Sequence, residues 1–188
     1  MTISKKIGTL LQNPNFLTSS RIFLAPVIVI LLIFPNKVTT LLAAALFSLA
    51  AISDYFDGYF ARRWGLVSNF GKVMDPVADK LIVSSSFIML SSLGWIPAWI
   101  ICIIIGRELA ITGLRSVIAE TGEDISASWL GKYKTGFQIA AIIPLLIHFP
   151  YFGINFHAIG MFFLWGALIF TIWSGTDYFI KFKNQLQM

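Results

Sequence analysis

The amino-acid sequence predicts an all-α integral membrane protein with six transmembrane helices, a short N-terminal interfacial helix and both termini in the cytoplasm. Three observations support this fold class. Of the 188 residues, 57% are hydrophobic and only 12% are charged, which lies far outside the usual range of soluble proteins. Six apolar runs have about the 20 residues that a helix needs to cross a bilayer. The lysines and arginines gather at alternate ends of these runs.

The six runs follow one another without a repeat, a linker or a low-complexity tract, so we expect a single membrane domain over residues 1–188. The predicted spans are residues 16–34, 39–62, 75–93, 95–118, 130–149 and 156–181. Residues 1–15 form the interfacial segment, because residues 3–11 combine apolar side chains with two lysines that suit an anionic membrane surface.

Positive charge sets the predicted orientation, because Lys and Arg near short loops stay on the cytoplasmic side. Lys37 is the only cation that breaks the pattern. The cations on the predicted cytoplasmic side are Lys5, Lys6, Arg62, Arg63, Lys72, Lys80, Arg107, Arg115, Lys132, Lys134, Lys181 and Lys183. Both termini and the ends of the second and third spans therefore face the cytoplasm in this prediction.

Four of the nine acidic residues, Asp54, Asp57, Asp75 and Asp79, lie within residues 54–79 at those two span ends. Positions three or four apart share a helix face, so each pair of acids points one way, and antiparallel neighbours bring the pairs together. Four carboxylates in a low-dielectric place repel or become protonated unless divalent cations neutralise them. Hard oxygen ligands favour magnesium or manganese, whereas one cysteine and two histidines do not indicate a zinc site.

The residues between the acids suit a bound diphosphate. Gly58, Ala61 and Gly71 lack bulk and let a ligand approach the backbone closely. Arg62 offers a planar fork of donors that matches phosphate. We therefore predict that a nucleotide diphosphate binds beside the metal ions.

A structural interpretation of the same acids is that Asp54 and Asp57 form salt bridges with Arg62 and Arg63, while Asp75 starts a helix before a proline. For any single aspartate this interpretation is the better one. Four acids together, with two glycines and an arginine at fixed spacing, favour the metal and diphosphate site.

Residues 54–79 read DYFDGYFARRWGLVSNFGKVMDPVAD, which matches D-x2-D-G-x2-A-R-x8-G-x3-D-x3-D at every fixed position. This stretch resembles the signature of the CDP-alcohol phosphatidyltransferase family. Eight specified residues at set spacing in a chain with six predicted spans make the resemblance far more specific than a lone glycine motif.

The resemblance implies a homodimer in a bacterial-type inner membrane, with a polar cavity open to the cytoplasm and no nucleic-acid partner. It implies that Asp54, Asp57 and Asp75 bind two divalent ions, and that Asp79 shares in the metal site and acts as the catalytic base. The positions that match the CDP-binding residues are Asp54, Gly58, Ala61, Arg62 and Gly71. The implied reaction moves the phosphatidyl group of CDP-diacylglycerol directly onto an alcohol and releases CMP.

Four cations, Arg107, Arg115, Lys132 and Lys134, indicate an acceptor alcohol that carries a phosphate. Residues 15–21 (NFLTSSR) and GEDISASWLGKYKT resemble members of the family that use glycerol 3-phosphate. Since Lys132 and Lys134 are two positions apart, a regular helix allows at most one of them to contact the acceptor. Alternatively, these cations serve only the positive-inside rule. The partner of Glu108 also stays open between Arg115 and Arg107.

Other functions compete with this prediction. A relative in the same family would use inositol phosphate, serine or phosphatidylglycerol as its acceptor. A divalent-cation transporter is less favoured, because the acids gather at one side of the membrane rather than at its midplane. A prenyl-diphosphate enzyme is also less favoured, since its second acidic motif is absent from the sequence.

Overall fold

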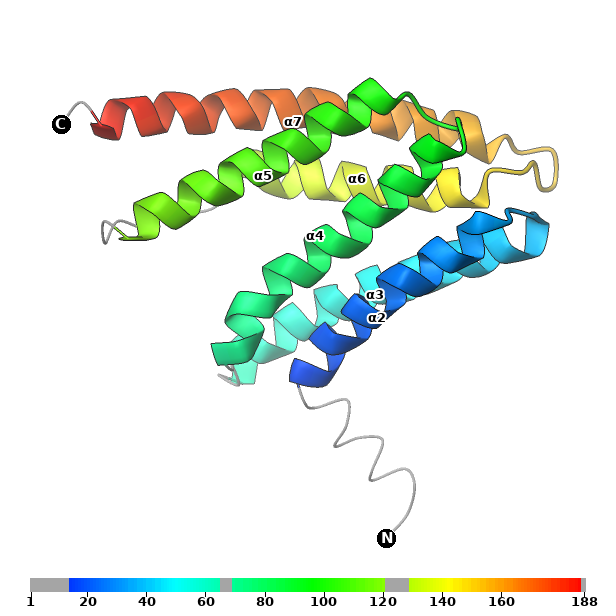
Figure 1. Ribbon diagram of the computed structural model, residues 1–188, viewed down its shortest axis with the longest axis horizontal. Helices are drawn as coiled ribbons and strands as arrows, with labels where there is room; N and C mark the ends of the chain where they lie inside the picture. The colour runs from blue at the N-terminus through cyan, green and yellow to red at the C-terminus, as the bar shows by residue number, and fades with distance from the viewer. Residues whose placement is uncertain (1–13, 65–68, 121–128, 187–188) are drawn as a thin grey trace, which may run out of the picture. The chain divides into compact units, whose positions relative to one another are not determined.

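The structure is a computed structural model that describes residues 14–64, 69–120 and 129–186 (Figure 1). Within these residues it consists of helices and short connections, which confirms the all-α class. The helices are α2 (Pro14–Ile33), α3 (Lys37–Trp64), α4 (Asn69–Ser92), α5 (Ala98–Glu120), α6 (Trp129–Ile147) and α7 (Phe156–Leu186). The predicted interfacial segment lies outside the described residues, except that Pro14 and Asn15 already belong to α2.

Several helix ends differ from the predicted span ends. The connection between the predicted spans 39–62 and 75–93 is shorter in the structure, because α3 continues to Trp64 and α4 already begins at Asn69. Asp75 therefore lies inside α4 rather than at its start. The reason is that a span predicted from apolar residues stops where the side chains become polar, whereas backbone hydrogen bonds continue the helix beyond that point. In the opposite direction, α5 begins at Ala98, later than the predicted residue 95.

The chain forms two compact units, one that ends at Met89 and one that begins at Leu90, and each is described by itself. In the first unit, α2 packs against α3 across a tight connection. The Asn36 side chain accepts hydrogen bonds from the backbone N–H groups of Val38 (2.9 Å) and Thr39 (3.0 Å). In return, the Thr39 hydroxyl accepts one from the Asn36 N–H (2.9 Å). This reciprocal cap fixes where α3 begins.

In the second unit, α7 packs against both α6 and α5, and two glycines let α7 approach α6 closely. A Cβ atom added at Gly160 would lie 2.5 Å from Leu145 Cγ and 3.0 Å from the Leu145 backbone nitrogen. One added at Gly166 would lie 2.5 Å from Phe137 Cδ1. Small residues at a helix interface allow such close backbone packing, which is a frequent device in membrane proteins.

We expect Gly160→Ala to destabilise the protein by about 1–2 kcal/mol, because overpacking at Leu145 exceeds the gain in helix propensity. The matched control is Gly136→Ala on α6, where a new Cβ meets no atom within 4 Å. That change should leave stability equal or raise it by up to about 1 kcal/mol. Thermal unfolding of both variants in detergent measures the difference, and equal melting temperatures would contradict the packing argument.

The outer surfaces of the helices are strongly apolar. Residues 37–54 of α3 and 156–180 of α7 are long and apolar enough to cross a membrane, and α2 holds a shorter apolar stretch over residues 20–33. Only 28% of the apolar segment of each of these two helices is buried, whereas the core helix of a soluble protein is mostly buried. Large side chains such as Phe23, Phe34 and Phe162 are exposed. Extended apolar surfaces of this kind suit contact with lipid.

Candidate active site

Arg21 joins the first and last acids of the motif in the first unit. From α2, its Nη1 atom donates to a carboxylate oxygen of Asp54 on α3 and to one of Asp79 on α4, the latter at 2.5 Å. The Arg21 side chain is 4% exposed, whereas Asp54 and Asp79 are 39% and 49% exposed. A buried guanidinium therefore lies behind two carboxylates that are accessible from the surface. The predicted convergence is confirmed for these two acids.

The inner acids of the motif lie in the same helices. Asp57 follows Asp54 by about one turn in α3, and Asp75 precedes Asp79 by about one turn in α4, so both spacings are helical as predicted. The side chains of several predicted site residues lie outside the described part of the structure, and their roles stay predictions: Asp57, Gly58, Ala61, Arg62, Gly71 and Asp75.

The described part of the acid site has ligand chemistry that fits a divalent cation. Its donors are oxygens of Asp54 and Asp79, which meet at one guanidinium atom and remain partly exposed. Magnesium and manganese prefer hard oxygen donors of this kind. Among the residues with described side chains no three acids, histidines or cysteines cluster, and two of the four predicted ligands are not in that set.

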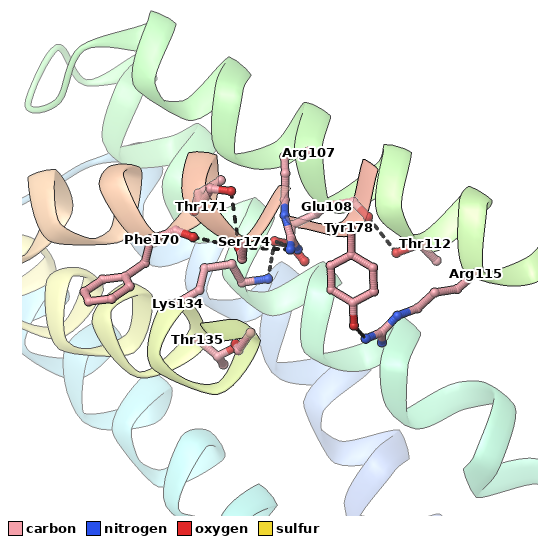
Figure 2. A network of polar contacts seen from close by, with 11 residues as sticks. Arg107, Glu108, Thr112, Arg115, Lys134, Thr135, Phe170, Thr171, Ser174 and Tyr178 are labelled. Carbon is pink, nitrogen blue, oxygen red and sulfur yellow. Dashed lines mark hydrogen bonds and ion pairs between the residues drawn. The ribbon is translucent and has the colours of Figure 1, made fainter. Parts of the chain in front are cut away.

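A second polar cluster lies inside the second unit, where α5, α6 and α7 contribute side chains (Figure 2). Glu108 on α5 accepts hydrogen bonds from its neighbour Arg107 (3.3 Å) and from Lys134 on α6. The other terminal nitrogen of Arg107 donates to the Ser174 hydroxyl on α7 (3.0 Å). The open question about Glu108 is thus answered, since it pairs with Arg107 and with Lys134. We call this cluster, together with Arg115 and Tyr178, the cation cluster.

Tyr178 of α7 contacts both arginines of α5. The Arg115 guanidinium donates to the Tyr178 hydroxyl, and its Cζ atom lies 4.9 Å from the centroid of the ring. The Cζ atom of Arg107 lies 5.7 Å from the same centroid. Both distances are within the range of cation–π attraction. Figure 2 shows the Tyr178 hydroxyl directed at the end of the Arg115 side chain.

The two lysines at the start of α6 point to different environments. Lys134 is buried and reaches Glu108, whereas Lys132 is exposed and its Nζ atom lies 4.7 Å from the ring centroid of Trp129. Helical geometry predicts that at most one of them contacts the acceptor, and the different environments of the two side chains agree with it. The structure brings Arg107, Arg115 and Lys134 together and leaves Lys132 outside the cluster.

The cation cluster carries an excess of positive charge. Glu108 pairs with Arg107 and Lys134, while Arg115 donates to the Tyr178 hydroxyl. Among the described side chains of this cluster, three cations and one carboxylate leave two net positive charges. Arg107 and Lys134 have side chains that are mostly buried, whereas Arg115 is exposed. Because charges away from water are costly unless they are paired, such an excess favours an anionic ligand. A phosphate monoester carries between about 1.5 and 2 negative charges at neutral pH and balances it.

Sequence reasoning missed four residues of these two clusters or their surroundings. Arg21 had a signal, because a charge inside an apolar helix indicates a functional position. Ser174 and Tyr178 had a weaker one, since they are four apart on one face of α7. One turn beyond Lys134, the buried amide nitrogen of Gln138 has no hydrogen-bond partner in the described structure, which is typical of groups near a ligand or water.

Comparison with known proteins gives one family and several close relatives. Residues 11–173 match the model of the CDP-alcohol phosphatidyltransferase family. A CDP-diacylglycerol–glycerol-3-phosphate 3-phosphatidyltransferase of Bacillus subtilis is 43% identical over 89% of this chain and 93% of its own length. Proteins with the same name are 40% identical in Rickettsia typhi, over 91% of this chain and 97% of theirs, and 34% identical in Salmonella choleraesuis, over 92% and 96%.

Proposed function

Because the chain belongs to the CDP-alcohol phosphatidyltransferase family, we propose that it transfers the phosphatidyl group of CDP-diacylglycerol to glycerol 3-phosphate. The products are phosphatidylglycerophosphate and CMP, which makes the protein a phosphatidylglycerophosphate synthase of phospholipid biosynthesis. The names of relatives that are 34–43% identical over most of the chain support this choice within the family.

The observation that carries the choice of acceptor is the net charge of the cation cluster. Two net positive charges from Arg107, Arg115, Lys134 and Glu108 complement the phosphate of glycerol 3-phosphate. Serine is zwitterionic, and phosphatidylglycerol carries one negative charge on a diester, so both match this cluster less well. Inositol phosphate has the same phosphate group, and the experiment below separates it from glycerol 3-phosphate.

In the proposed reaction, Asp79 accepts the proton of the acceptor hydroxyl. The hydroxyl oxygen then forms a bond to the lipid-side phosphorus, and the bond from that phosphorus to the CMP oxygen breaks. Arg21 contributes by holding Asp79 and Asp54 at one point. Gly58, Ala61, Arg62 and Gly71 are the proposed contacts of the CDP portion, together with Asp54.

We also propose that the acids of the motif bind two divalent ions, which are Mg²⁺ or Mn²⁺. The residues that would hold them are Asp54, Asp57, Asp75 and Asp79. When bound, the ions neutralise negative charge on the diphosphate and on the departing CMP. The oxygen donors of Asp54 and Asp79 support this proposal.

The proposed topology is one domain with six membrane spans in a bacterial inner membrane, both termini and the active site facing the cytoplasm. Six helices in the described residues and the apolar, exposed surfaces of α3 and α7 support the spans. The family match over residues 11–173 runs through both compact units, which supports a single catalytic domain. A homodimer is proposed from membership of the family.

The test is CMP release by detergent-solubilised protein given CDP-diacylglycerol and Mg²⁺. Glycerol 3-phosphate, inositol phosphate, serine or no acceptor is supplied in parallel. We expect CMP release only with glycerol 3-phosphate, and loss of release when a chelator removes the metal. Release with another alcohol would overturn the acceptor, and no release with any alcohol would overturn the function. Metal uptake by sealed vesicles would then support a transporter.

A further inference from the structure

We infer that one face of α7, formed by Ser174, Gly175 and Tyr178, is a positioning platform that holds Arg107 and Arg115 as a pair for the acceptor's phosphate. The inference rests on the proposed function and assigns a role to three residues that lie outside the signature motif. None of the three needs to touch the substrate, because each acts through an arginine of α5. All the contacts involved lie within the second unit.

Tyr178 is the centre of this platform. It is buried, its hydroxyl accepts a hydrogen bond from Arg115, and its ring lies within 6 Å of both guanidinium carbons. The guanidinium groups of Arg107 and Arg115 repel each other when both lie against the Tyr178 ring. They therefore need a partner that holds both. A carboxylate would cancel one of the charges that the phosphate needs. The neutral phenol attracts both cations through its π face and its hydroxyl oxygen and leaves their charge available.

Ser174 and Gly175 fix the second arginine. The buried Ser174 hydroxyl accepts from Arg107 (3.0 Å) and donates to the Phe170 carbonyl oxygen (2.6 Å), so its oxygen has a fixed direction. A Cβ atom at Gly175 would lie 3.3 Å from Arg107 Cγ, which is tighter than ordinary contact. The absence of a side chain at this position therefore lets the Arg107 stem lie against α7.

Fixed arginines bind phosphate more tightly than mobile ones, because less side-chain entropy is lost when the ligand binds. Arginine also binds phosphate through a planar fork, which requires the correct orientation of the guanidinium plane as well as its position. Loss of the platform should therefore weaken binding of the acceptor and leave use of the CDP-lipid nearly unchanged. A residue with a general structural role would affect both substrates together.

The test compares Tyr178→Phe, Tyr178→Leu and the control Phe179→Leu, whose side chain is the exposed neighbour on α7. The measured quantities are kcat and the apparent KM values for glycerol 3-phosphate and CDP-diacylglycerol. Tyr178→Leu should raise the KM for glycerol 3-phosphate about 30-fold, since both the ring and the hydroxyl are lost. Tyr178→Phe keeps the ring and should raise it about fivefold. The KM for CDP-diacylglycerol and all constants of Phe179→Leu should stay within about twofold.

Equal increases in both KM values, or an unchanged KM for glycerol 3-phosphate in Tyr178→Leu, would overturn the platform. If Tyr178→Leu does not fold, Ser174→Ala decides, and it should raise the KM for glycerol 3-phosphate about fivefold without changing that for the lipid. Failure of the proposed function gives a different result, because the wild-type protein would then release no CMP in response to glycerol 3-phosphate.

Discussion

Asp79→Asn should lower the kcat of CMP release by about a thousandfold, because an amide cannot accept the proton of the acceptor hydroxyl. Asn has nearly the same shape as Asp and can still accept a hydrogen bond from Arg21 through its carbonyl oxygen. The fold and the binding of CDP-diacylglycerol should therefore change little. Steady-state CMP release over a range of both substrates measures kcat and the two KM values separately.

The comparison variants are Asp54→Asn and Thr176→Ala. Asp54 makes the same contact with Arg21 and is proposed, like Asp79, to bind metal, but it is not the proposed base. Its variant should therefore lose turnover mainly through a higher requirement for Mg²⁺. Thr176 on α7 is exposed and its hydroxyl donates to the carbonyl oxygen of Trp173 in the same helix (2.8 Å), so its variant should keep nearly full turnover. Full activity in Asp79→Asn, or a raised KM with an unchanged kcat, would contradict its role as the base. Size-exclusion chromatography checks that each variant is folded.

The acid site shows what a sequence motif can predict. The spacing of Asp54 to Asp57 and of Asp75 to Asp79 predicts helical pairs, and both helices are present, because local hydrogen bonding sets that geometry. The motif does not predict Arg21, which comes from a different helix. Arg21 is separated in sequence from Asp54 by 33 residues and from Asp79 by 58 residues. Contacts over such separations depend on how the helices pack, and periodicity along the chain carries no such information.

The cation cluster shows the same limit more strongly. Charge counting predicted an anionic acceptor and helical geometry predicted that one of Lys132 and Lys134 would be excluded. Which lysine is buried depends on the side of α6 that packs against its neighbours, so spacing alone did not decide it. Glu108 has Lys134 as a partner 26 positions away rather than Arg115 in its own helix. Tyr178 is neutral and sits in an apolar helix, so it gave no electrostatic signal.

The two lysines also provide a matched pair for a second prediction of large effect. Lys134→Met should raise the KM for glycerol 3-phosphate about 30- to 100-fold, because it removes a charged contact and halves the net positive charge of the cluster. Lys132→Met should change the same KM by less than about twofold, since Lys132 is exposed and lies over Trp129. Kinetics of CMP release with varied glycerol 3-phosphate measures both variants.

A double variant, Lys134→Met with Glu108→Gln, separates the two reasons for that loss. It restores two net positive charges, carried by Arg107 and Arg115, but not the lysine itself. If net charge governs binding of the acceptor, the KM of the double variant for glycerol 3-phosphate should be at least about tenfold lower than that of Lys134→Met. If the Lys134 ammonium itself binds the phosphate, no recovery should follow, because the contact is still absent. An equal effect of Lys132→Met and Lys134→Met would contradict both explanations and remove the cation cluster from the acceptor site.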